Sequence, residues 1–387
     1  MKFLKDFNFT NKRVLVRVDF NEPIKDGQLA SDFKIRAARL TIEYLLEQNA
    51  KIILLTHWGR PDGKVVEELK TDLLGQSLSL LIGQKVKKLN GCVGEEIREE
   101  IDRMGPGEII LLENVQFEPG EKANNPKFAA ALAELADFFI LDAFGQAHRD
   151  YASISGVPKL LPSCAGLLLA KEVKVLSGIL NKPKRPLVVI IGGVKISTKI
   201  ELIESFSNQA DNLLLGGALA NTFLKAKGIS VGQSVIEEEM VGKVKEMNLD
   251  NDKIVSLVDG VVSASVDGKS TSRISPIGDL SENEMILDIG PETVKKFEDI
   301  IKKAETIIWN GPMGLFEIGL FASGSNAIAE AITQSKAFSL VGGGDTIALL
   351  EGLNLLDKIG HISTGGGAML EFLAGKKLAG LEALKKQ

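Results

Sequence analysis

The sequence has few cysteines and histidines: two and three, respectively, among 387 residues. Cys92 and Cys164 lie far apart and form no C-x-x-C pair, so we expect two reduced thiols rather than a disulfide framework. The histidines lack metal-ligand spacing. No apolar run reaches about 18 residues, and the first ten residues lack the apolar segment of a signal peptide. These absences predict a cytoplasmic protein without a membrane span.

Aromatic residues are also scarce, at 5%, whereas glycine is abundant, at 39 residues. That combination favours many strand-to-helix turns over an all-β sandwich. Hydrophobic residues at 44% and charged residues at 25% are an ordinary globular mixture, and the length predicts two or three domains. The formal net charge of −5 argues against a general nucleic-acid binder.

Short apolar runs alternate with amphipathic runs along the whole chain, which is typical of βαβ units with a mainly parallel sheet. The predicted strands are 13–18, 51–56, 108–112, 138–141, 187–191, 212–215, 253–257, 306–309, 337–341 and 361–362. The predicted helices are 34–48, 71–81, 126–136, 165–180, 197–208, 218–226, 237–246, 291–303, 323–335 and 346–352. So many strands predict an α/β fold of two doubly wound, Rossmann-like parallel-sheet domains, joined by the helix over 165–180.

The segments that follow the predicted strands differ between the two halves of the chain. Ligands of open α/β sheets bind beyond the carboxyl ends of the strands, so these segments are candidate sites. In the first half they carry polar and charged side chains, including Asp19, His57, Arg60 and Arg149. In the second half they carry glycines and a lysine-bearing turn at 192–195. The second set suits a nucleotide polyphosphate, and the first suits a smaller anion.

The segment 342–346, Gly-Gly-Gly-Asp-Thr, lies between a predicted strand and a predicted helix. Glycines let consecutive N–H groups turn toward one point, and the helix N-terminus favours a phosphate there. Asp345 offers a hard oxygen ligand to a phosphate-bound Mg²⁺, and the Thr346 hydroxyl can donate to a phosphate oxygen. A tight turn with Asp345 as helix N-cap explains the same residues about equally well, so this segment alone leaves both interpretations open.

Two familiar nucleotide-binding patterns are missing. The P-loop pattern G-x-x-x-x-G-K-[ST] does not occur, and 192–199 is only loosely similar to it. No G-x-G-x-x-G follows an early strand with an acidic residue roughly 20 residues further on. The sequence therefore excludes an ordinary P-loop kinase and a dinucleotide dehydrogenase.

Taken together and in order, several stretches resemble the phosphoglycerate kinase family along the whole chain. The stretches are RVDFN-x-P (17–23), HWGRP (57–61), LLEN (111–114), DAFG-x-AHR (142–149), GG-x-K (192–195), LDIGPET (287–293), WNGPMG (309–314), GGGDT (342–346) and STGGGA (363–368). Any one of them could arise by chance, but all of them in family order are highly specific.

The resemblance implies a phosphotransferase of glycolysis and gluconeogenesis that moves a phosphoryl group between 1,3-bisphosphoglycerate and ADP, or between 3-phosphoglycerate and ATP in reverse. It implies Mg²⁺ bound with the nucleotide. It also implies an acid-binding domain over 1–165, a nucleotide-binding domain over 166–366 and a segment, 367–387, that returns to the first domain, with a deep cleft and hinge bending between the domains. We expect a monomer without nucleic-acid or membrane partners.

The resemblance also implies roles for residues of the second half. Lys195 and the N–H groups of Gly343 and Gly344 would contact the transferred phosphoryl group as catalytic groups, and Lys199 would contact the α-phosphate. Asp345 would bind Mg²⁺. The other predicted nucleotide-binding residues surround the adenine, the ribose and the phosphates: Gly216, Gly217, Asn310, Pro312, Glu317, Gly342 and Thr346.

In the first half, the resemblance implies that Asp19 and Asn21 hydrogen-bond the C2 hydroxyl of the acid. His57, Arg60 and Arg149 would supply donors for its carboxylate and distal phosphate. The remaining predicted substrate-binding residues belong to the same stretches or to the helix after them: Phe20, Lys34, Trp58, Gly59 and Gln116.

Two of these positions depart from the family pattern. Lys34 stands where the family has a catalytic arginine, and Gln116 stands where it has an arginine for the substrate phosphate. Arginine binds phosphate as a planar two-pronged donor, lysine acts as a point charge, and glutamine carries no charge. A charge-assisted hydrogen bond is worth about 1.5–3 kcal/mol, so each change would weaken binding or transfer by roughly one to two orders of magnitude.

The departures leave three hypotheses. The leading one is an active phosphoglycerate kinase with an altered acid-binding patch, because the nucleotide half is intact. The second keeps the fold and the nucleotide site but changes the acceptor to another carboxylic acid. The third is a nucleotide-binding scaffold that has lost catalysis.

Overall fold

A computed structural model describes residues 1–249 and 251–385, and the chain divides into two compact units. Unit 1 holds Met1–Lys174 and the C-terminal segment that begins at Lys376, and unit 2 holds Val175–Gly375. The divisions at 174/175 and 375/376 lie about nine residues after the predicted domain limits at 165/166 and 366/367. The predicted domain limits at 165/166 and 366/367 remain predictions.

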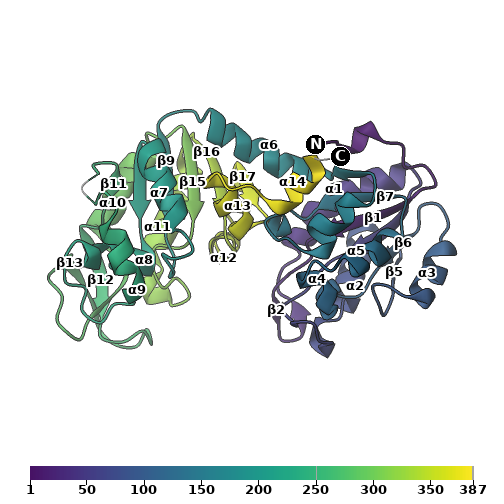
Figure 1. Ribbon diagram of the computed structural model, residues 1–387. Helices are drawn as coiled ribbons and strands as arrows, with labels where there is room; N and C mark the ends of the chain where they lie inside the picture. The colour runs from purple at the N-terminus through teal and green to yellow at the C-terminus, as the bar shows by residue number, and fades with distance from the viewer. Residues whose placement is uncertain (250, 386–387) are drawn as a thin grey trace. The chain divides into compact units, whose positions relative to one another are not determined.

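Unit 1 is built on a parallel sheet with the strand order β5-β6-β4-β1-β7-β8 (Figure 1). Its strands are β1 (Arg13–Val18), β4 (Lys51–Leu55), β5 (Val86–Lys88), β6 (Ile109–Leu111), β7 (Phe138–Asp142) and β8 (Ser163–Ala165). Its α-helices are α1 (Phe33–Glu47), α2 (Asp72–Ile82), α3 (Glu95–Asp102), α4 (Pro119–Lys122), α5 (Pro126–Ala133) and α14 (Ala379–Lys385). A short hairpin of β2 (Ile24–Lys25) and β3 (Gln28–Leu29) follows β1, and helix α6 (Leu167–Asn181) runs from unit 1 into unit 2.

Unit 2 has a second parallel sheet, in the order β11-β10-β9-β15-β16-β17, and a smaller antiparallel sheet, β13-β12-β14. The parallel strands are β9 (Leu187–Ile191), β10 (Asn212–Leu215), β11 (Ile254–Val255), β15 (Thr306–Asn310), β16 (Phe338–Gly342) and β17 (His361–Ser363). The antiparallel strands are β12 (Asp259–Ser263), β13 (Ser272–Pro276) and β14 (Met285–Ile289). The α-helices that begin and end in this unit are α7 (Ile200–Gln209), α8 (Gly217–Ala226), α9 (Glu238–Lys245), α10 (Pro291–Ile301), α11 (Ser323–Gln334), α12 (Gly344–Gly352) and α13 (Gly366–Leu373).

The parallel strands form because short runs of Val, Ile and Leu are buried on both faces, as expected where helices cover both sides of a sheet. All residues of β9 are buried, and so is β1 from Val14 onward. Helix α1 buries one apolar stripe of Ile35, Ala38, Ile42 and Leu45, at the helical spacing of three and four. The predicted α/β class with two parallel-sheet units is confirmed.

In each parallel sheet the strand order reverses beside the first strand of the sheet, and this point locates the candidate site. Numbered along the chain, the unit 2 sheet has the order 3-2-1-4-5-6, so the reversal falls between β9 and β15. In unit 1 the corresponding reversal falls between β1 and β7. Open α/β sheets bind ligands beyond the carboxyl ends of the strands at such points.

Several elements differ from the sequence-based prediction. The prediction missed the hairpin of β2 and β3, the strands β5 and β8, the helices α3, α4, α13 and α14, and the antiparallel sheet. Strand β13 of that sheet is largely exposed and polar and therefore gave no apolar run. Helix α7 begins at Ile200 rather than at residue 197. Ser197 Oγ and Thr198 Oγ1 donate to Glu237 Oε1 (2.6 Å) and to Lys195 O (3.0 Å), and such side-chain hydrogen bonds favour a turn over a helix.

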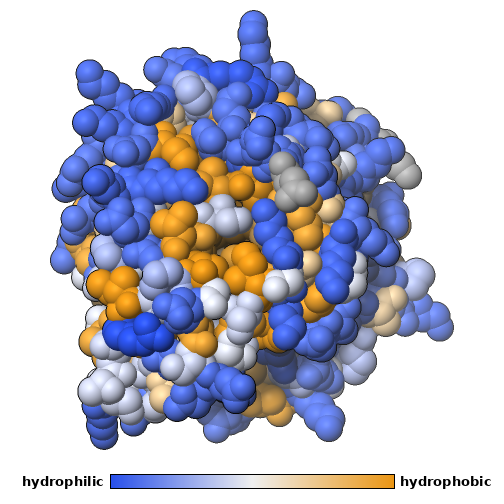
Figure 2. Space-filling view, turned by 90° about the vertical axis from the view of Figure 1, so that its left-hand side faces the viewer, coloured by the Kyte–Doolittle hydropathy of each residue, from blue (hydrophilic) through white to orange (hydrophobic). Residues whose placement is uncertain are grey.

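Apolar side chains also reach the surface of unit 2. Figure 2 shows the face that lies at the left of Figure 1, where apolar side chains gather near the middle and hydrophilic ones surround them. Across the described residues, no helix combines the length and apolar character that crossing a membrane requires.

Candidate active site

The ends of β9 and β15 lie so close together that only glycine fits between them. A Cβ on Gly192 would lie 2.1 Å from Pro312 O, and a Cβ on Gly311 would lie 2.3 Å from Gly192 O. The N–H of Gly193 donates to Pro312 O (2.8 Å) and that of Gly217 to Met313 O (2.8 Å). These glycines therefore build the backbone floor of the site, and the N–H groups of Gly193 and Gly217 bond within the protein. Of the four, only Gly217 is a predicted nucleotide-binding residue.

Gly343 joins β16 to α12 in a conformation that favours glycine. Its φ is +102°, and a Cβ there would lie 2.8 Å from Nδ2 of Asn310, which donates to Gly342 O (2.6 Å). Gly343 is also the N-cap of α12, and no side chain caps the helix. Asp345 therefore lies in the first turn and is not the N-cap that the alternative interpretation required. The first N–H groups of a helix have no intrahelical acceptor, so this end can receive an anion.

Thr346 fastens the start of α12 to the end of β15. Its side chain is buried, and its Oγ1 accepts the N–H of Gly311 at 2.8 Å. The predicted phosphate contact of Thr346 thus depends on a hydroxyl that already has a structural role.

Lys199 and Asp345 lie close to each other, although 146 positions separate them in the sequence. The Lys199 ammonium donates to Gly192 O and lies against the backbone of Gly193 and Gly311. Burial lowers the pKa of Lys199 to about 8, and the negative charge of Asp345 opposes that shift. Lys195, on the same turn, is exposed to solvent. The structure therefore gives the two predicted phosphate lysines different environments.

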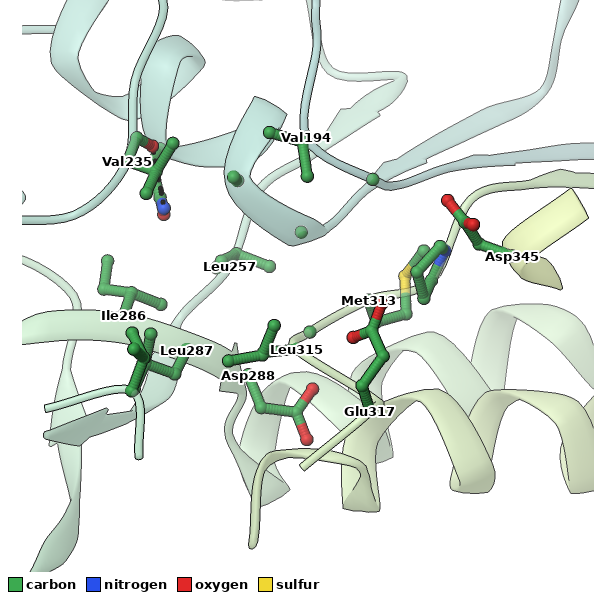
Figure 3. A pocket seen from close by; sticks show the side chains of 17 residues that line it. Val194, Val235, Leu257, Ile286, Leu287, Asp288, Met313, Leu315, Glu317 and Asp345 are labelled. Carbon is green, nitrogen blue, oxygen red and sulfur yellow. Dashed lines mark hydrogen bonds between the residues drawn. The ribbon is translucent and has the colours of Figure 1, made fainter. Parts of the chain in front are cut away.

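A cavity of about 160 Å³ opens beside these groups (Figure 3). Leu257, Ile286 and Leu315 contribute apolar walls, whereas the carboxylates of Glu317 and Asp345 lie at one end of the cavity. Other predicted nucleotide-binding residues among its lining are Gly217 and Pro312. An apolar slot with polar groups at one end suits a flat base with a charged tail.

In unit 1, the loop after β1 is tied to the end of β4. Asn21 N donates to Asp19 Oδ1 (3.2 Å), Gly59 N donates to Asn21 Oδ1 (2.8 Å), and Phe20 N donates to Thr56 Oγ1 (2.9 Å). Lys34 Nζ lies 3.4 Å from Asp19 Oδ2. The structure thus brings together three predicted acid-binding residues, Asp19, Asn21 and Lys34.

Asp19 is almost fully buried, yet it stays ionised. Burial alone would raise its pKa, but the positive charges of Lys34 and Arg17 and the N–H of Asn21 bring the pKa below its ordinary value. A buried carboxylate beside an ammonium can accept a hydroxyl hydrogen from a ligand. This environment is compatible with the predicted contact to a substrate hydroxyl.

His57 is buried and neutral. Burial, the largest cause, lowers its pKa to about 3, and the charges of Arg17, Lys34 and Arg149 lower it further against the opposing effect of Asp19. Arg17 Nη2 lies 3.4 Å from His57 Nδ1. Because arginine only donates, Nδ1 accepts, and the ring proton resides on Nε2. His57 can therefore offer an uncharged N–H donor.

The other predicted acid-binding residues fall into two groups. Arg60 and Arg149 are exposed, and their guanidinium groups are accessible to an anion. The side chains of Phe20 and Trp58 are buried in the core, so they support the loop rather than face solvent. Gln116 is 5% exposed, and in the described part of the chain its buried Oε1 has no hydrogen-bond partner.

Sequence reasoning missed a buried network behind this loop. Arg17 is fully buried, its Nε donates to Ser153 Oγ (2.8 Å), and Ser153 Oγ donates to Glu121 Oε1 (2.6 Å). It also missed Glu22, whose carboxylate accepts the N–H groups of Lys34 and Ile35. A charged residue inside the apolar run of β1 was the signal for the network. No local pattern connects Glu22 to α1.

Each α/β unit carries polar or charged groups at the reversal of its parallel sheet, and unit 2 adds a helix end that can receive an anion. This arrangement is typical of a two-unit α/β enzyme. The profile of the phosphoglycerate kinase family matches residues 4–376. The chain is 46% identical to the phosphoglycerate kinase of Moorella thermoacetica, covering 99% of both chains. It is also 46% identical to that of Dictyoglomus turgidum, covering 99% of this chain and 98% of the relative.

Solved structures agree with the sequence relatives. A phosphoglycerate kinase from Coxiella burnetii has a TM-score of 0.87 at 39% identity, covering 100% of this chain and 99% of that one. One from Pyrococcus horikoshii has a TM-score of 0.88 at 35% identity, covering 100% and 98%. The chain belongs to the phosphoglycerate kinase family.

The chain is thus an enzyme, a phosphotransferase of glycolysis that exchanges a phosphoryl group between 1,3-bisphosphoglycerate and ADP. The comparisons give no support to the two alternatives, a different carboxylic acid or a non-catalytic scaffold. The departures at Lys34 and Gln116 are therefore features of an enzyme of this family.

Proposed function

We propose that the acid binds at the strand ends of unit 1 and that the Mg–nucleotide binds at the strand ends of unit 2. The observation that supports the nucleotide site most directly is the meeting of Lys199, Asp345 and the uncapped end of α12 beside an apolar cavity. The ammonium and the N–H groups would bind the polyphosphate, and the cavity would hold the base. Gly216 and Gly217 would lie against the base, and Glu317 would accept from the ribose hydroxyls.

In this proposal, Asp345 holds Mg²⁺ together with the nucleotide phosphates. The side chain is exposed in the first turn of α12, where a carboxylate can reach a cation. Within residues 1–249 and 251–385, no three His, Cys, Asp or Glu side chains cluster in a way that could hold a metal ion. Mg²⁺ commonly binds through one or two carboxylates plus substrate phosphates, so the residues present fit it. When bound, the cation would neutralise phosphate charge.

Phosphoryl transfer depends mainly on positioning and on donors around the transferred group. Lys195 and the N–H groups of Gly343 and Gly344 would supply those donors on the nucleotide side. In unit 1, Asp19 and Asn21 would bind the C2 hydroxyl of the acid. His57, Arg60 and Arg149 would bind the carboxylate and the distal phosphate. Lys34 would replace the family arginine. The backbone near four other residues would shape the loop: Phe20, Trp58, Gly59 and Gln116.

These assignments are tested by measuring the KM for ATP and the KM for 3-phosphoglycerate separately in variants of each unit. We expect Asp345→Asn to raise the Mg²⁺ and ATP requirements more than tenfold while leaving the KM for 3-phosphoglycerate within about twofold. Lys34→Met should do the reverse. A coupled assay with 3-phosphoglycerate and Mg–ATP measures both, and equal effects on both substrates would contradict the assignment.

We further propose that the enzyme acts in the cytoplasm as a monomer, without nucleic-acid or membrane partners. Its glycolytic activity supports the cytoplasm, and its net charge of −5 argues against nucleic-acid partners. Light scattering after size exclusion tests the monomer: a mass near 41.7 kDa is expected, and twice that mass would contradict it.

A further inference from the structure

Two backbone N–H groups at the start of α1 are capped by a residue twelve and thirteen positions earlier in the chain. Lys34 N and Ile35 N donate to Glu22 Oε1, at 2.5 Å and 3.3 Å. The N-cap residue of the helix, Asp32, makes no side-chain cap bond, and the first turn contains no acidic residue. Glu22 therefore supplies the capping carboxylate that the local sequence lacks.

The two neighbouring N–H groups have their own acceptors. Phe33 N donates to Ser31 Oγ at 3.2 Å, and Arg36 N donates to Asp32 O at 2.9 Å. A helix begins with four N–H groups that have no intrahelical acceptor. Here the four belong to Asp32, Phe33, Lys34 and Ile35, because Arg36 N already makes the first intrahelical bond. Glu22 thus accounts for the last two of the four, and one of these belongs to Lys34.

Glu22 is itself held on both sides by buried groups. Its carbonyl accepts Trp58 Nε1 at 2.8 Å, and its N–H donates to Phe20 O at 2.8 Å. Trp58 is buried, and Glu22 is 5% exposed. Glu22 therefore connects the loop after β1 and the segment after β4 to the start of α1.

We infer that Glu22 is a positioning residue for the acid site, which fixes the start of α1 so that the Lys34 ammonium lies beside Asp19. The inference rests on the proposed role of Lys34. A lysine ends in a point charge on a flexible four-carbon stem, so the place of its backbone decides where the charge can reach. The family stretch RVDFN-x-P specifies no residue at position 22. Glu22 is therefore a feature of this chain to be tested beside Lys34.

The charged groups that act on the Glu22 carboxylate are Asp19, in its own loop, and Lys34, on α1. Burial raises the pKa of Glu22 to about 7, with Asp19 adding to the shift and the N–H groups and charge at Lys34 opposing it. An ionised carboxylate is a stronger acceptor for helix N–H groups than a neutral carboxyl group. The hold on Lys34 should therefore strengthen as pH rises through about 7.

Two variants at Glu22 separate the hydrogen bonds from the charge. Glu22→Ala removes both, and we expect kcat/KM for 3-phosphoglycerate to fall about tenfold to a hundredfold, with the KM for ATP within about twofold. Glu22→Gln keeps an acceptor oxygen without the charge. The ratio of wild-type to Glu22→Gln kcat/KM for 3-phosphoglycerate should rise about threefold or more between pH 6 and pH 8. Glu43→Ala, which removes an exposed pair with Arg39 on the same helix, is the matched control and should leave both constants unchanged.

A double-mutant cycle tests whether Glu22 acts through Lys34. We expect Glu22→Ala to lower kcat/KM for 3-phosphoglycerate by less than about twofold when it is added to Lys34→Met. Full additivity of the two losses would overturn the inference and leave the proposed role of Lys34 intact. No effect of Lys34→Met on the acid would overturn both. If Glu22→Ala does not fold, the Glu22→Gln profile decides, and a pH dependence equal to that of the wild type overturns the inference.

Discussion

Replacing Gly343 by alanine should damage the nucleotide site, whereas the same change at its neighbour Gly344 should not destabilise the fold. At Gly343 the φ of +102° is strained for any residue with a Cβ, at a cost of roughly 1–3 kcal/mol. The new Cβ would lie 2.8 Å from Asn310 Nδ2, which is buried and donates to Gly342 O. Displacing that amide leaves a buried polar group unpaired, which costs about 1–3 kcal/mol.

Backbone strain and the unpaired amide together should therefore lower the free energy of unfolding of Gly343→Ala by about 2–6 kcal/mol. Gly344 is the first helical residue of α12, is exposed, and a Cβ there meets no atom within 4 Å. Alanine is favoured over glycine in a helix, so Gly344→Ala should change stability by at most about 1 kcal/mol, in the favourable direction. The two variants differ by one position and by the same methyl group, which makes them a matched pair.

Thermal unfolding of both variants measures the difference. In a unit of about 200 residues, each kcal/mol of lost stability lowers the melting temperature by roughly 2–4 °C. Gly343→Ala should therefore melt about 5–20 °C below Gly344→Ala. Steady-state assays should show kcat lowered more than tenfold in Gly343→Ala, with the KM for 3-phosphoglycerate near its wild-type value. Equal melting temperatures for the two variants would refute the reasoning, because neither the backbone strain nor the Asn310 contact would then exist.

Three further changes have defined outcomes. The pKa of Lys199 is lowered to about 8, so raising the pH from 7 to 9 removes its charge, and the KM for ATP should rise severalfold. Lys199→Arg stays charged, and steady-state kinetics at a series of pH values should show a flatter dependence for this variant. Gln116→Arg should lower the KM for 3-phosphoglycerate by up to about tenfold, and an unchanged KM would contradict the role of this position. The same variant should lower the urea midpoint of unfolding, because a charge enters a site that is 5% exposed. Arg17→Met should destabilise the protein by about 3–5 kcal/mol in urea unfolding, because it leaves the buried Glu121 carboxylate without a cation. The double variant Arg17→Met, Glu121→Gln should recover part of this lost stability.

The architecture could be predicted because the information for parallel strands is local. A run such as Leu187–Ile191 is apolar throughout, since helices cover both faces of its sheet, and such runs stand out in a sequence. The short strands β5 and β8 cover three residues each and were missed. The antiparallel sheet was also missed. Its strand β13 exposes most of its residues and has no continuous apolar run, but β12 and β14 are mostly buried and were not recognised either.

The candidate site was predictable where backbone conformation decides it. Glycines at 192, 311 and 343 are required by close approach or by a positive φ, and both requirements leave glycine in the sequence. Side-chain environments were not predictable in this way. The neutral state of His57 comes from burial and from Arg17. The lowered pKa of Lys199 comes from burial against the ends of two strands, β9 and β15.

Long-range capping is the clearest limit on reading this chain from its sequence. Glu22 caps the first turn that carries Lys34, and Glu237 accepts the N–H and the hydroxyl of Ser197, in the turn that carries Lys195 and Lys199. In each case a carboxylate from a distant segment fixes the backbone from which a flexible cation extends. A family pattern marks positions at which a cation is expected, but it does not mark the residue that holds the backbone at such a position. The efficiency of a lysine in place of an arginine therefore depends on such supporting contacts as well as on its own donors.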